Sequence, residues 1–246
     1  METTAWHIVE LQEANSTNTY LDHLDNDTPQ SEGCVVMTHR QWAGRGQRGN
    51  TWEAEPGKNL TFSYLLRPDG ILPQEQFLLS QAAALAVVDV LSQYADGFSV
   101  KWPNDIYYRD SKVAGILIEH SLAGMSIERT IVGIGLNINQ QLFVSDAPNP
   151  ISLSLITGQT YDLKIILSQI LQATTLRYNM CTQSPEQLQS DYAAVLYRRE
   201  GYFPYRDVQG EFMAAIEAVM PDGHLLLCDT EGTTRRYAFK EVAFVM

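Results

Sequence analysis

Residues 38–60 read THRQWAGRGQRGNTWEAEPGKNL, and this stretch decides which folds the chain can adopt. Gly44, Gly46 and Gly49 fit the pattern G-x-G-x-x-G, which binds dinucleotides only where a helix begins directly at the glycines. Here Pro56 and Gly57 follow within a few residues and predict a loop. No G-K-[S/T] follows either, which excludes a Walker phosphate loop. The segment therefore predicts a glycine-rich loop of another kind.

The glycine-rich loop is basic, although the chain is acidic. The 246 residues include 29 Asp and Glu against 17 Lys and Arg, a formal charge of −12, whereas residues 40–67 contain five basic side chains and two acidic ones. Flexible glycines let backbone N–H groups approach an anion, and arginines chelate phosphate oxygens. Trp42 and Trp52 supply apolar walls of the kind found in small-molecule sites. A solvated surface loop is the alternative interpretation.

Composition excludes several classes of protein. Apolar residues make up 45% of the chain, which is too many for a disordered or fibrous protein. The negative net charge argues against general binding of nucleic acid. Three dispersed cysteines, no signal peptide and no apolar run of about 20 residues predict a protein of the reducing cytoplasm that does not cross a membrane.

The order of segments predicts an α/β (α+β) architecture in two domains. Strand patterns occupy 33–40, 59–67 and four further segments between 98 and 139, and residues 75–95 predict a helix that is buried on most sides. Helices are expected at about 162–180 and 186–199. From about 205, turn signals alternate with short apolar runs, which predicts a small antiparallel barrel. The expected domains are 1–200 and 201–246.

Three further segments contain candidate functional residues. In KWPNDIYYRDSKVAGILIE (101–119), Asp105 lies at a turn, and Lys112 begins a strand beside Gly115, where a point charge could meet a phosphate. In RTIVGIGLNIN (129–139), strand alternation predicts that Gly133, Gly135 and Asn137 share one face, which leaves room for a ligand. An exposed lysine and close strand–helix packing are the structural alternatives.

Near the start of the chain, Ser16-Thr17-Asn18 precedes a short helical stretch (19–24). Ordinary helix capping explains such residues, and a cluster that orients a neutral polar ligand is the functional alternative.

Taken together, these motifs resemble the biotin–protein ligases of the bacterial type. The match comprises Ser16-Thr17-Asn18, Gln41 with the loop from Ala43 to Gly49, the segment from Lys101 to Ile116, and Gly133 to Asn139, in family order and at family-like spacing. The resemblance implies a mixed-sheet catalytic domain with packed helices and a C-terminal SH3-like barrel. It also implies that biotin and ATP form biotinyl-5′-adenylate, with Mg²⁺, before biotin passes to a lysine of a biotin carboxyl carrier protein domain of a biotin-dependent carboxylase.

The resemblance also assigns roles to residues. The biotin-binding set is Ser16, Thr17, Asn18, Gln41, Arg45, Gly46, Gln47, Lys112 and Gly115. The ATP-binding set is Arg48, Trp52 and Asn137, with Lys112 and Arg48 as the catalytic pair and Asp105 as a candidate for positioning magnesium. Gln47 departs from the arginine of many relatives, and we expect weaker retention of the adenylate. Ser16 lies too near the start of the chain for an N-terminal helix-turn-helix domain, so repressor function is not expected.

Other functions remain open from the sequence. A lipoate-type ligase or octanoyltransferase shares the fold, but the octanoyltransferase type needs a catalytic cysteine, and none of the three cysteines lies in a motif. A non-catalytic biotin sensor would be expected to lose Arg48 or Lys112, and both are present. A peptide-binding adaptor based on the C-terminal barrel is a further alternative. The exposed edge of a mixed sheet would allow a homodimer.

Overall fold

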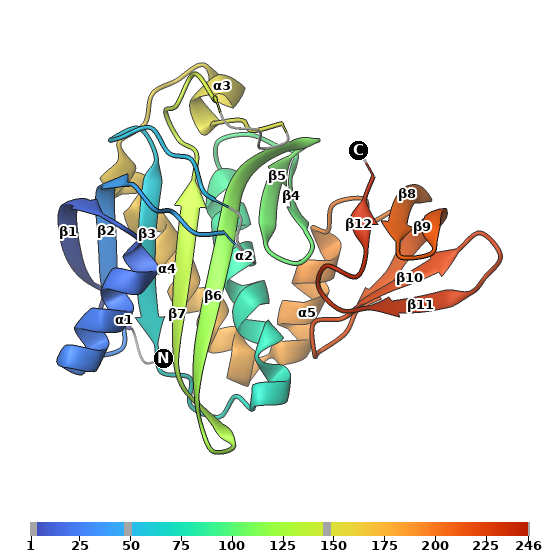
Figure 1. Cartoon of the computed structure of the whole chain (residues 1–246), viewed down its shortest axis with the longest axis horizontal. Coiled ribbons are helices and arrows are strands. Elements are labelled where there is room, and N and C mark those ends of the chain that lie inside the picture. The colour runs from blue at the N-terminus through green and yellow to red at the C-terminus, as the bar shows by residue number, and fades with distance from the viewer. Residues whose placement is uncertain (1–3, 47–50, 145–148, 246) are drawn as a thin grey trace.

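Alternating apolar residues build a seven-stranded mixed sheet, seen in the computed structural model, which describes residues 4–46, 51–144 and 149–245 (Figure 1). The strand order is β1-β2-β3-β7-β6-β5-β4. β1 pairs with β2 in parallel, and the other neighbours are antiparallel. The strands are β1 (His7–Ala14), β2 (Cys34–Gln41), β3 (Leu60–Leu66), β4 (Phe98–Lys101), β5 (Asp105–Tyr108), β6 (Ser111–Ala123) and β7 (Ser126–Leu136).

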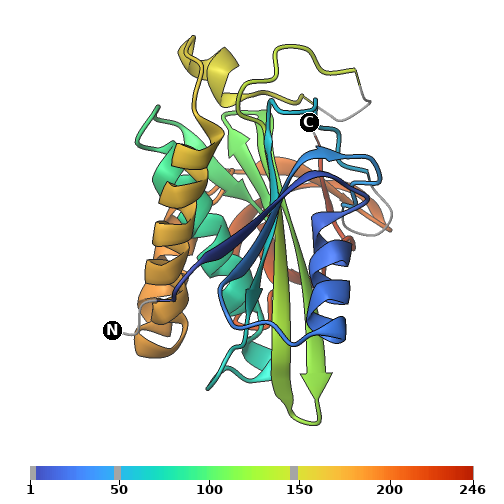
Figure 2. The ribbon, with the colours of Figure 1, turned by 90° about the vertical axis from the view of Figure 1, so that its left-hand side faces the viewer.

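Helices lie on both faces of this sheet (Figure 2). α1 (Thr17–Asp27) crosses over between the parallel strands β1 and β2 and covers one face, where Leu21 packs against Val36, Leu65 and Ile131. The other face carries α2 (Phe77–Leu91), α4 (Leu163–Gln183) and α5 (Pro185–Ala194). A short 3-10 turn (Pro73–Glu75) precedes α2, and α3 (Leu153–Thr157) follows the loop after β7.

α2 confirms the prediction of a helix buried on most sides. Thirteen of its fifteen residues are buried, because the sheet lies on one side and α4 and α5 pack on the other. α5 begins at Pro185, within one residue of the predicted start, but it ends five residues before the expected position. The chain leaves the helix there because Val195 O accepts from Val100 N and Tyr197 N donates to Val100 O, so this segment extends the sheet beside β4.

The C-terminal part forms a separate five-stranded antiparallel sheet, in agreement with the expected SH3-like unit. Its order is β11-β10-β9-β8-β12, with β8 (Phe203–Asp207), β9 (Gly210–Val219), β10 (Leu225–Asp229), β11 (Thr234–Tyr237) and β12 (Ala243–Phe244). Trp102 joins the two sheets: its indole Nε1 donates to Gly223 O at 2.9 Å, and its ring packs edge-on against Phe239. This junction fixes the C-terminal sheet beside the strand ends of β4 and β5.

The strand β1 and the helix α3 are elements that the sequence patterns do not predict. Within the described residues, no helix is both long and apolar enough to cross a membrane.

Candidate functional site

A cavity of about 410 Å³ lies between the open face of the main sheet and the C-terminal sheet. Its walls come from the N-terminus of α1, the strands β3, β6 and β7, the end of β2 with the loop residues 45–46 and 51–52, the turn between β4 and β5, and residues 239–240 and 242–244. Most of the predicted site residues meet here, although they come from distant parts of the chain. These residues are Ser16, Thr17, Asn18, Gln41, Arg45, Gly46, Trp52, Asp105, Lys112 and Gly115.

The first turn of α1 supplies the polar end of the cavity. Ser16 is the N-cap residue, and its hydroxyl accepts from Thr19 N at 3.5 Å, so the capping explanation is correct for this residue. The helix also brings Thr17 and Asn18 to the cavity wall, where both side chains are buried. Capping and ligand orientation are therefore compatible in one segment.

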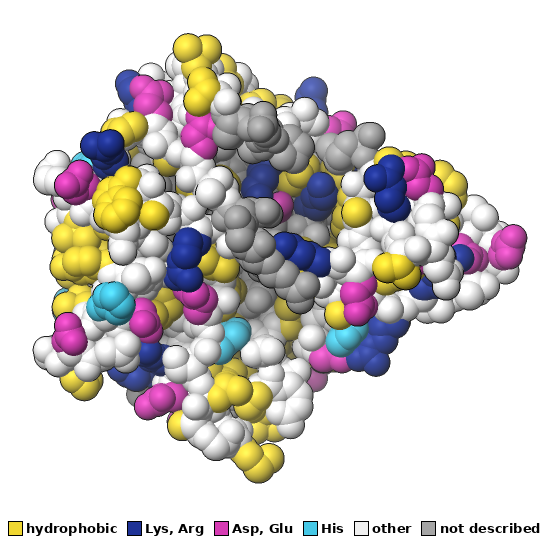
Figure 3. Space-filling view, viewed as in Figure 1, with side chains coloured by type: hydrophobic (Ala, Val, Ile, Leu, Met, Phe, Trp, Pro, Cys, Tyr) yellow, Lys and Arg dark blue, Asp and Glu magenta, His cyan; other side chains and the backbone are white. Residues whose placement is uncertain are grey.

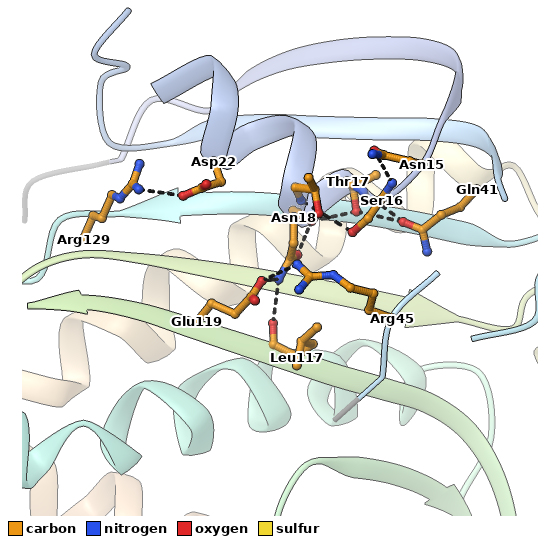
Figure 4. A network of polar contacts seen from close by, with 12 residues as sticks. Asn15, Ser16, Thr17, Asn18, Asp22, Gln41, Arg45, Leu117, Glu119 and Arg129 are labelled. Carbon is orange, nitrogen blue, oxygen red and sulfur yellow. Dashed lines mark hydrogen bonds and ion pairs between the residues drawn. The ribbon is translucent and has the colours of Figure 1, made fainter. Parts of the chain in front are cut away.

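Hydrogen bonds fix the orientation of these polar groups (Figure 4). The amide nitrogen of Asn18 donates to Glu119 Oε2 at 2.7 Å and to Leu117 O at 3.3 Å. The Oδ1 of Asn18 is therefore the atom that faces Ser63. Ser63 Oγ lies 2.5 Å from that oxygen and has a single proton to donate to it. The 2.7 Å contact between the hydroxyls of Ser63 and Thr17 then takes its proton from Thr17. Thr17 consequently presents lone pairs to the cavity and acts as an acceptor.

Gln41 has the opposite polarity. Its Oε1 accepts from the backbone N–H of Thr17 at 2.9 Å, which turns its amide nitrogen away from that contact. The nitrogen carries two protons and can only donate. The polar end of the cavity therefore combines a hydroxyl acceptor and an amide donor, which suits a ligand with adjacent N–H and C=O groups.

Two glycines of β7 make room for side chains that approach the sheet. A Cβ atom at Gly133 would lie 2.1 Å from Asn18 Oδ1, and one at Gly135 would lie 2.3 Å from Cε2 of Trp52. The predicted alternation of Val132 and Ile134 with Gly133 and Gly135 is confirmed, because the first two belong to the hydrophobic core while the glycines face Asn18 and Trp52. The glycine face thus accepts close packing from α1 and from the loop, and it also borders the ligand space.

The order along β7 and β6 extends the site in one direction. Residues two apart on a strand are separated by about 7 Å, so Asn18 and Trp52 occupy successive places along the cavity floor. Gly115 pairs with Gly135 in register, and a Cβ atom there would lie 3.1 Å from Trp52 and 3.5 Å from Lys112 Nζ. The polar end, the indole wall and the lysine follow one another across the sheet.

The end with Lys112 is positively charged. The described residues that line the cavity include one carboxylate, Asp105, and the four cations Arg45, Lys101, Lys112 and Lys240. Figure 3 shows basic side chains gathered between the main sheet and the C-terminal sheet. Lys112 Nζ lies 2.7 Å from Asp105 Oδ1 and 5.7 Å from the centre of the Trp52 ring. The cavity therefore favours an anion in spite of the net charge of the chain.

Lys101 is a cation of this site to which the sequence motifs assigned no role. Its Nζ donates to the hydroxyl of Tyr107 at 3.0 Å and lies 5.3 Å from the ring centre of Phe244 in β12. Burial lowers the pKa of Lys101, and the nearby carboxylate of Asp105 opposes this effect. Its place as the first residue of the matched segment from Lys101 to Ile116 is the signal that could have identified it.

Two buried polar atoms near the site have no hydrogen-bond partner among the described residues. They are Nε1 of Trp52 and Oδ1 of Asn137. Asn137 does not line the cavity itself; its amide nitrogen donates to Ile151 O at 3.2 Å behind the beginning of β6. A buried donor and a buried acceptor without partners are features of a site that a polar ligand completes.

Several predicted residues are placed differently from the central set. Gln47 and Arg48 lie outside the described residues. Trp42 is exposed and does not line the main cavity. Ser63 and Glu119, which the sequence motifs did not identify, orient Asn18. No cluster of three or more acidic, histidine or cysteine side chains suited to a metal occurs in the described part of the chain.

Comparisons with known proteins agree with this geometry. A sequence model of the Biotin/lipoate A/B protein ligase family matches residues 10–137. The bifunctional ligase/repressor BirA of Bacillus subtilis (strain 168) is 29% identical over 250 residues, which cover 96% of this chain and 74% of that protein. The biotin–[acetyl-CoA-carboxylase] ligase of Paracoccus denitrificans is 36% identical over 146 residues, 56% of this chain and 60% of the relative.

A solved structure extends the similarity to the whole chain. The biotin protein ligase from Aquifex aeolicus in complex with biotin and ATP superposes with a TM-score of 0.79 at 25% identity. The match covers 96% of this chain and 97% of that one, so it includes both sheets.

Proposed function

This chain belongs to the Biotin/lipoate A/B protein ligase family, and we propose that it uses ATP to attach biotin to a lysine of a carrier protein. The observation that carries the proposal is the order of groups in one cavity: a polar end at Thr17 and Gln41, the Trp52 wall, and the cationic end at Lys112. Biotin has the same order, with a ureido group, an apolar ring and chain, and a carboxylate.

The polar end suits the ureido group. A ureido group offers one carbonyl oxygen and two N–H groups. Thr17 Oγ1 accepts from an N–H, and the amide nitrogen of Gln41 donates to the carbonyl. Pairing every polar group of a neutral ligand inside a buried site gives specificity, because an analogue without those groups leaves Thr17 and Gln41 unpaired.

At the cationic end, a carboxylate oxygen of biotin attacks the α-phosphorus of ATP. The new O–P bond forms as the bond to the bridging oxygen breaks, and pyrophosphate leaves with that electron pair. Lys112 offsets the repulsion between the carboxylate and the phosphate, and Gly115 lets the carboxylate approach the strand backbone. The amine of a carrier lysine then attacks the acyl carbon of the adenylate. An amide bond forms, the amine loses one proton, and AMP leaves as the bond between the acyl carbon and the phosphate oxygen breaks.

The nucleotide would lie between the two sheets. We assign Trp52 to the wall of the adenylate and Arg48 to its phosphates, and the unpaired Oδ1 of Asn137 suits the exocyclic amine of adenine. Magnesium would enter with ATP. Asp105 is the one carboxylate among the described lining residues and is our candidate for positioning the Mg²⁺ ion. A Mg²⁺ ion that is held mainly by phosphates and water requires only one or two protein carboxylates.

The partner that we propose is a biotin carboxyl carrier protein domain of a carboxylase, since the relative in Paracoccus denitrificans is named for acetyl-CoA carboxylase. We also propose that the chain acts in the cytoplasm. We further propose that residues 1–200 form the ligase domain and residues 201–246 an SH3-like domain.

We also propose that the chain forms a homodimer, and this proposal rests on a separate observation. β5 pairs with β6 only over residues 111–115, so within the described residues no strand covers that edge of β6 from Ile118 to Ala123. An open strand edge can pair with a second copy of the chain.

The decisive experiment for the function is biotin-dependent exchange between ATP and pyrophosphate with magnesium. We expect exchange with biotin and none with lipoate or octanoate. Exchange with lipoate alone would overturn the substrate, and tight binding of biotin without exchange would indicate a sensor. A thiol-dependent acyl transfer is not favoured, because Cys34 and Cys181 are buried and none of the three cysteines is among the cavity residues.

A further inference from the structure

Glu119 joins three separate parts of the site through one carboxylate oxygen. The residue lies on β6, and its Oε2 accepts from Asn18 Nδ2 at 2.7 Å and from Arg45 Nη2 at 3.0 Å (Figure 4). Asn18 belongs to the first turn of α1, and Arg45 belongs to the glycine-rich loop. The two residues that Glu119 connects are 27 positions apart in the sequence and both line the cavity.

The carboxylate of Glu119 contributes little to the stability of the fold. The side chains of Glu119 and Arg45 are 42% and 48% exposed, and an ion pair at that exposure contributes about 0–1 kcal/mol to stability. Asn18 would keep its bonds to Leu117 O and Ser63 without Glu119. The contribution of Glu119 is therefore one of position more than of stability.

On the α1 side, Glu119 fixes the amide of Asn18. Its 2.7 Å bond is charge-assisted and shorter than the 3.3 Å bond to Leu117 O, so it is the stronger of the two. The orientation of Asn18 determines the proton direction through Ser63 to Thr17. Glu119 thus reinforces the amide orientation that makes Thr17 an acceptor, together with the weaker bond to Leu117 O.

On the loop side, Glu119 fixes the segment that carries Trp52. Arg45 forms a β-bridge with Thr51, and Trp52 N donates to Gly44 O at 3.1 Å. A guanidinium held by Glu119 therefore holds the paired residues that set Trp52 against Gly135.

We propose that Glu119 is a positioning residue that couples the polar end of the cavity to the loop residues around Arg45, so that both adopt the biotin-binding arrangement together. This inference rests on the proposed function. It adds a residue that acts through Asn18 and Arg45 and does not itself line the main cavity.

The test is a double-mutant cycle with Glu119→Gln, Arg45→Gln and the double variant. The readouts are the Kd for biotin from calorimetry and the KM for biotin and for ATP in pyrophosphate exchange. We expect each single change to weaken biotin binding about tenfold, the size of one charge-assisted hydrogen bond. The KM for ATP is expected to rise as well, because the loop that Glu119 holds carries Trp52. The double variant is expected to match the singles, because both changes remove the same link.

Glu13→Gln is the matched control, since Glu13 pairs with Arg40 at 3.9 Å on the exposed side of β1 and β2. A normal Kd for biotin in Glu119→Gln would overturn the proposal. A double variant about a hundredfold weaker than wild type would also overturn it, because the two residues would then act independently. Wild-type protein that binds no biotin and shows no exchange would instead overturn the proposed function.

Discussion

Replacing Gly133 by alanine tests the arrangement of the polar end with one added carbon atom. The new Cβ would lie 2.1 Å from Asn18 Oδ1 and 2.9 Å from Asn18 Cγ, whereas ordinary contacts begin near 3.4 Å. The strand cannot retreat, because β7 is paired on both sides, with Ser63 opposite Gly133 on β3 and Leu117 opposite it on β6. Asn18 must therefore move by more than 1 Å, and the first turn of α1 must move with it.

The magnitude follows from what that movement breaks. Asn18 would lose its bonds to Ser63 and Glu119 in a buried place, and overpacking adds strain; together we expect a loss of about 1–3 kcal/mol of stability. Catalytic groups displaced by about 1 Å lose roughly 100-fold in rate. We therefore expect the kcat/KM for biotin in pyrophosphate exchange to fall roughly 100-fold while the protein stays folded.

The assay combines exchange at varied biotin with urea unfolding. Glu128→Ala is the control, because Glu128 lies on the same strand at an exposed position. A folded Gly133→Ala protein with the wild-type kcat/KM for biotin would refute the reasoning, since Asn18 could not then be part of the biotin site.

Four further predictions follow from the same structure. Gly135→Ala places a Cβ 2.3 Å from Trp52, so we expect the KM for ATP to rise more than the Kd for biotin, and the reverse order would contradict the assignment of Trp52. Lys112→Ala is expected to reduce pyrophosphate exchange by several orders of magnitude with little loss of stability. The control Lys164→Ala, at an exposed lysine, is expected to leave the exchange rate unchanged, and an active Lys112→Ala protein would show that Lys112 has no part in the mechanism. Gln47→Arg is expected to slow the release of the adenylate in a rapid-dilution assay. Equal release rates for wild type and the variant would contradict the expectation that Gln47 weakens retention of the adenylate. Burial opposes ionisation of Asp25, but the N–H of Gln30 and the guanidinium groups of Arg129 and Arg67 outweigh burial and lower the pKa of Asp25. Asp25→Asn should therefore reduce the free energy of unfolding by about 3 kcal/mol at pH 7. In urea unfolding, this difference from wild type should close as the pH falls below about 4, and a difference that stays constant with pH would contradict the argument.

The sequence predicted those parts of the site that depend on local periodicity. Strict alternation along β7 separated Val132 and Ile134 from Gly133 and Gly135, because successive side chains of a strand point to opposite faces. Leu136 and Ile138 continue the core face, and Asn137 between them does not line the cavity. β7 ends at Leu136, and beyond that point the backbone of Asn137 bonds to Val113 and to Leu153 at the start of α3, so Asn137 lies beyond the paired part of the strand.

The parts that could not be predicted depend on strand order. Ser63 belongs to no motif, Glu119 is only the unassigned last residue of the segment 101–119, and each lies far from Asn18 in the sequence. They contact Asn18 because the order β3-β7-β6 places their strands on either side of Gly133. A single sequence does not specify that order, since several arrangements bury the same apolar faces.

An acidic chain can bind a polyphosphate because the charge that matters is local. Among the described lining residues, four cations face one carboxylate, although the chain as a whole carries −12. Salt screens exposed charges beyond about 8 Å, so distant acidic side chains oppose the ligand weakly, while groups on the cavity wall act at full strength. The acidic partners also have a positive role: Asp105 holds Lys112 and Glu119 holds Arg45 in defined positions. Cations that are oriented in advance stabilise a developing negative charge without the cost of reorganising when it forms, which is the condition under which electrostatic catalysis is most effective.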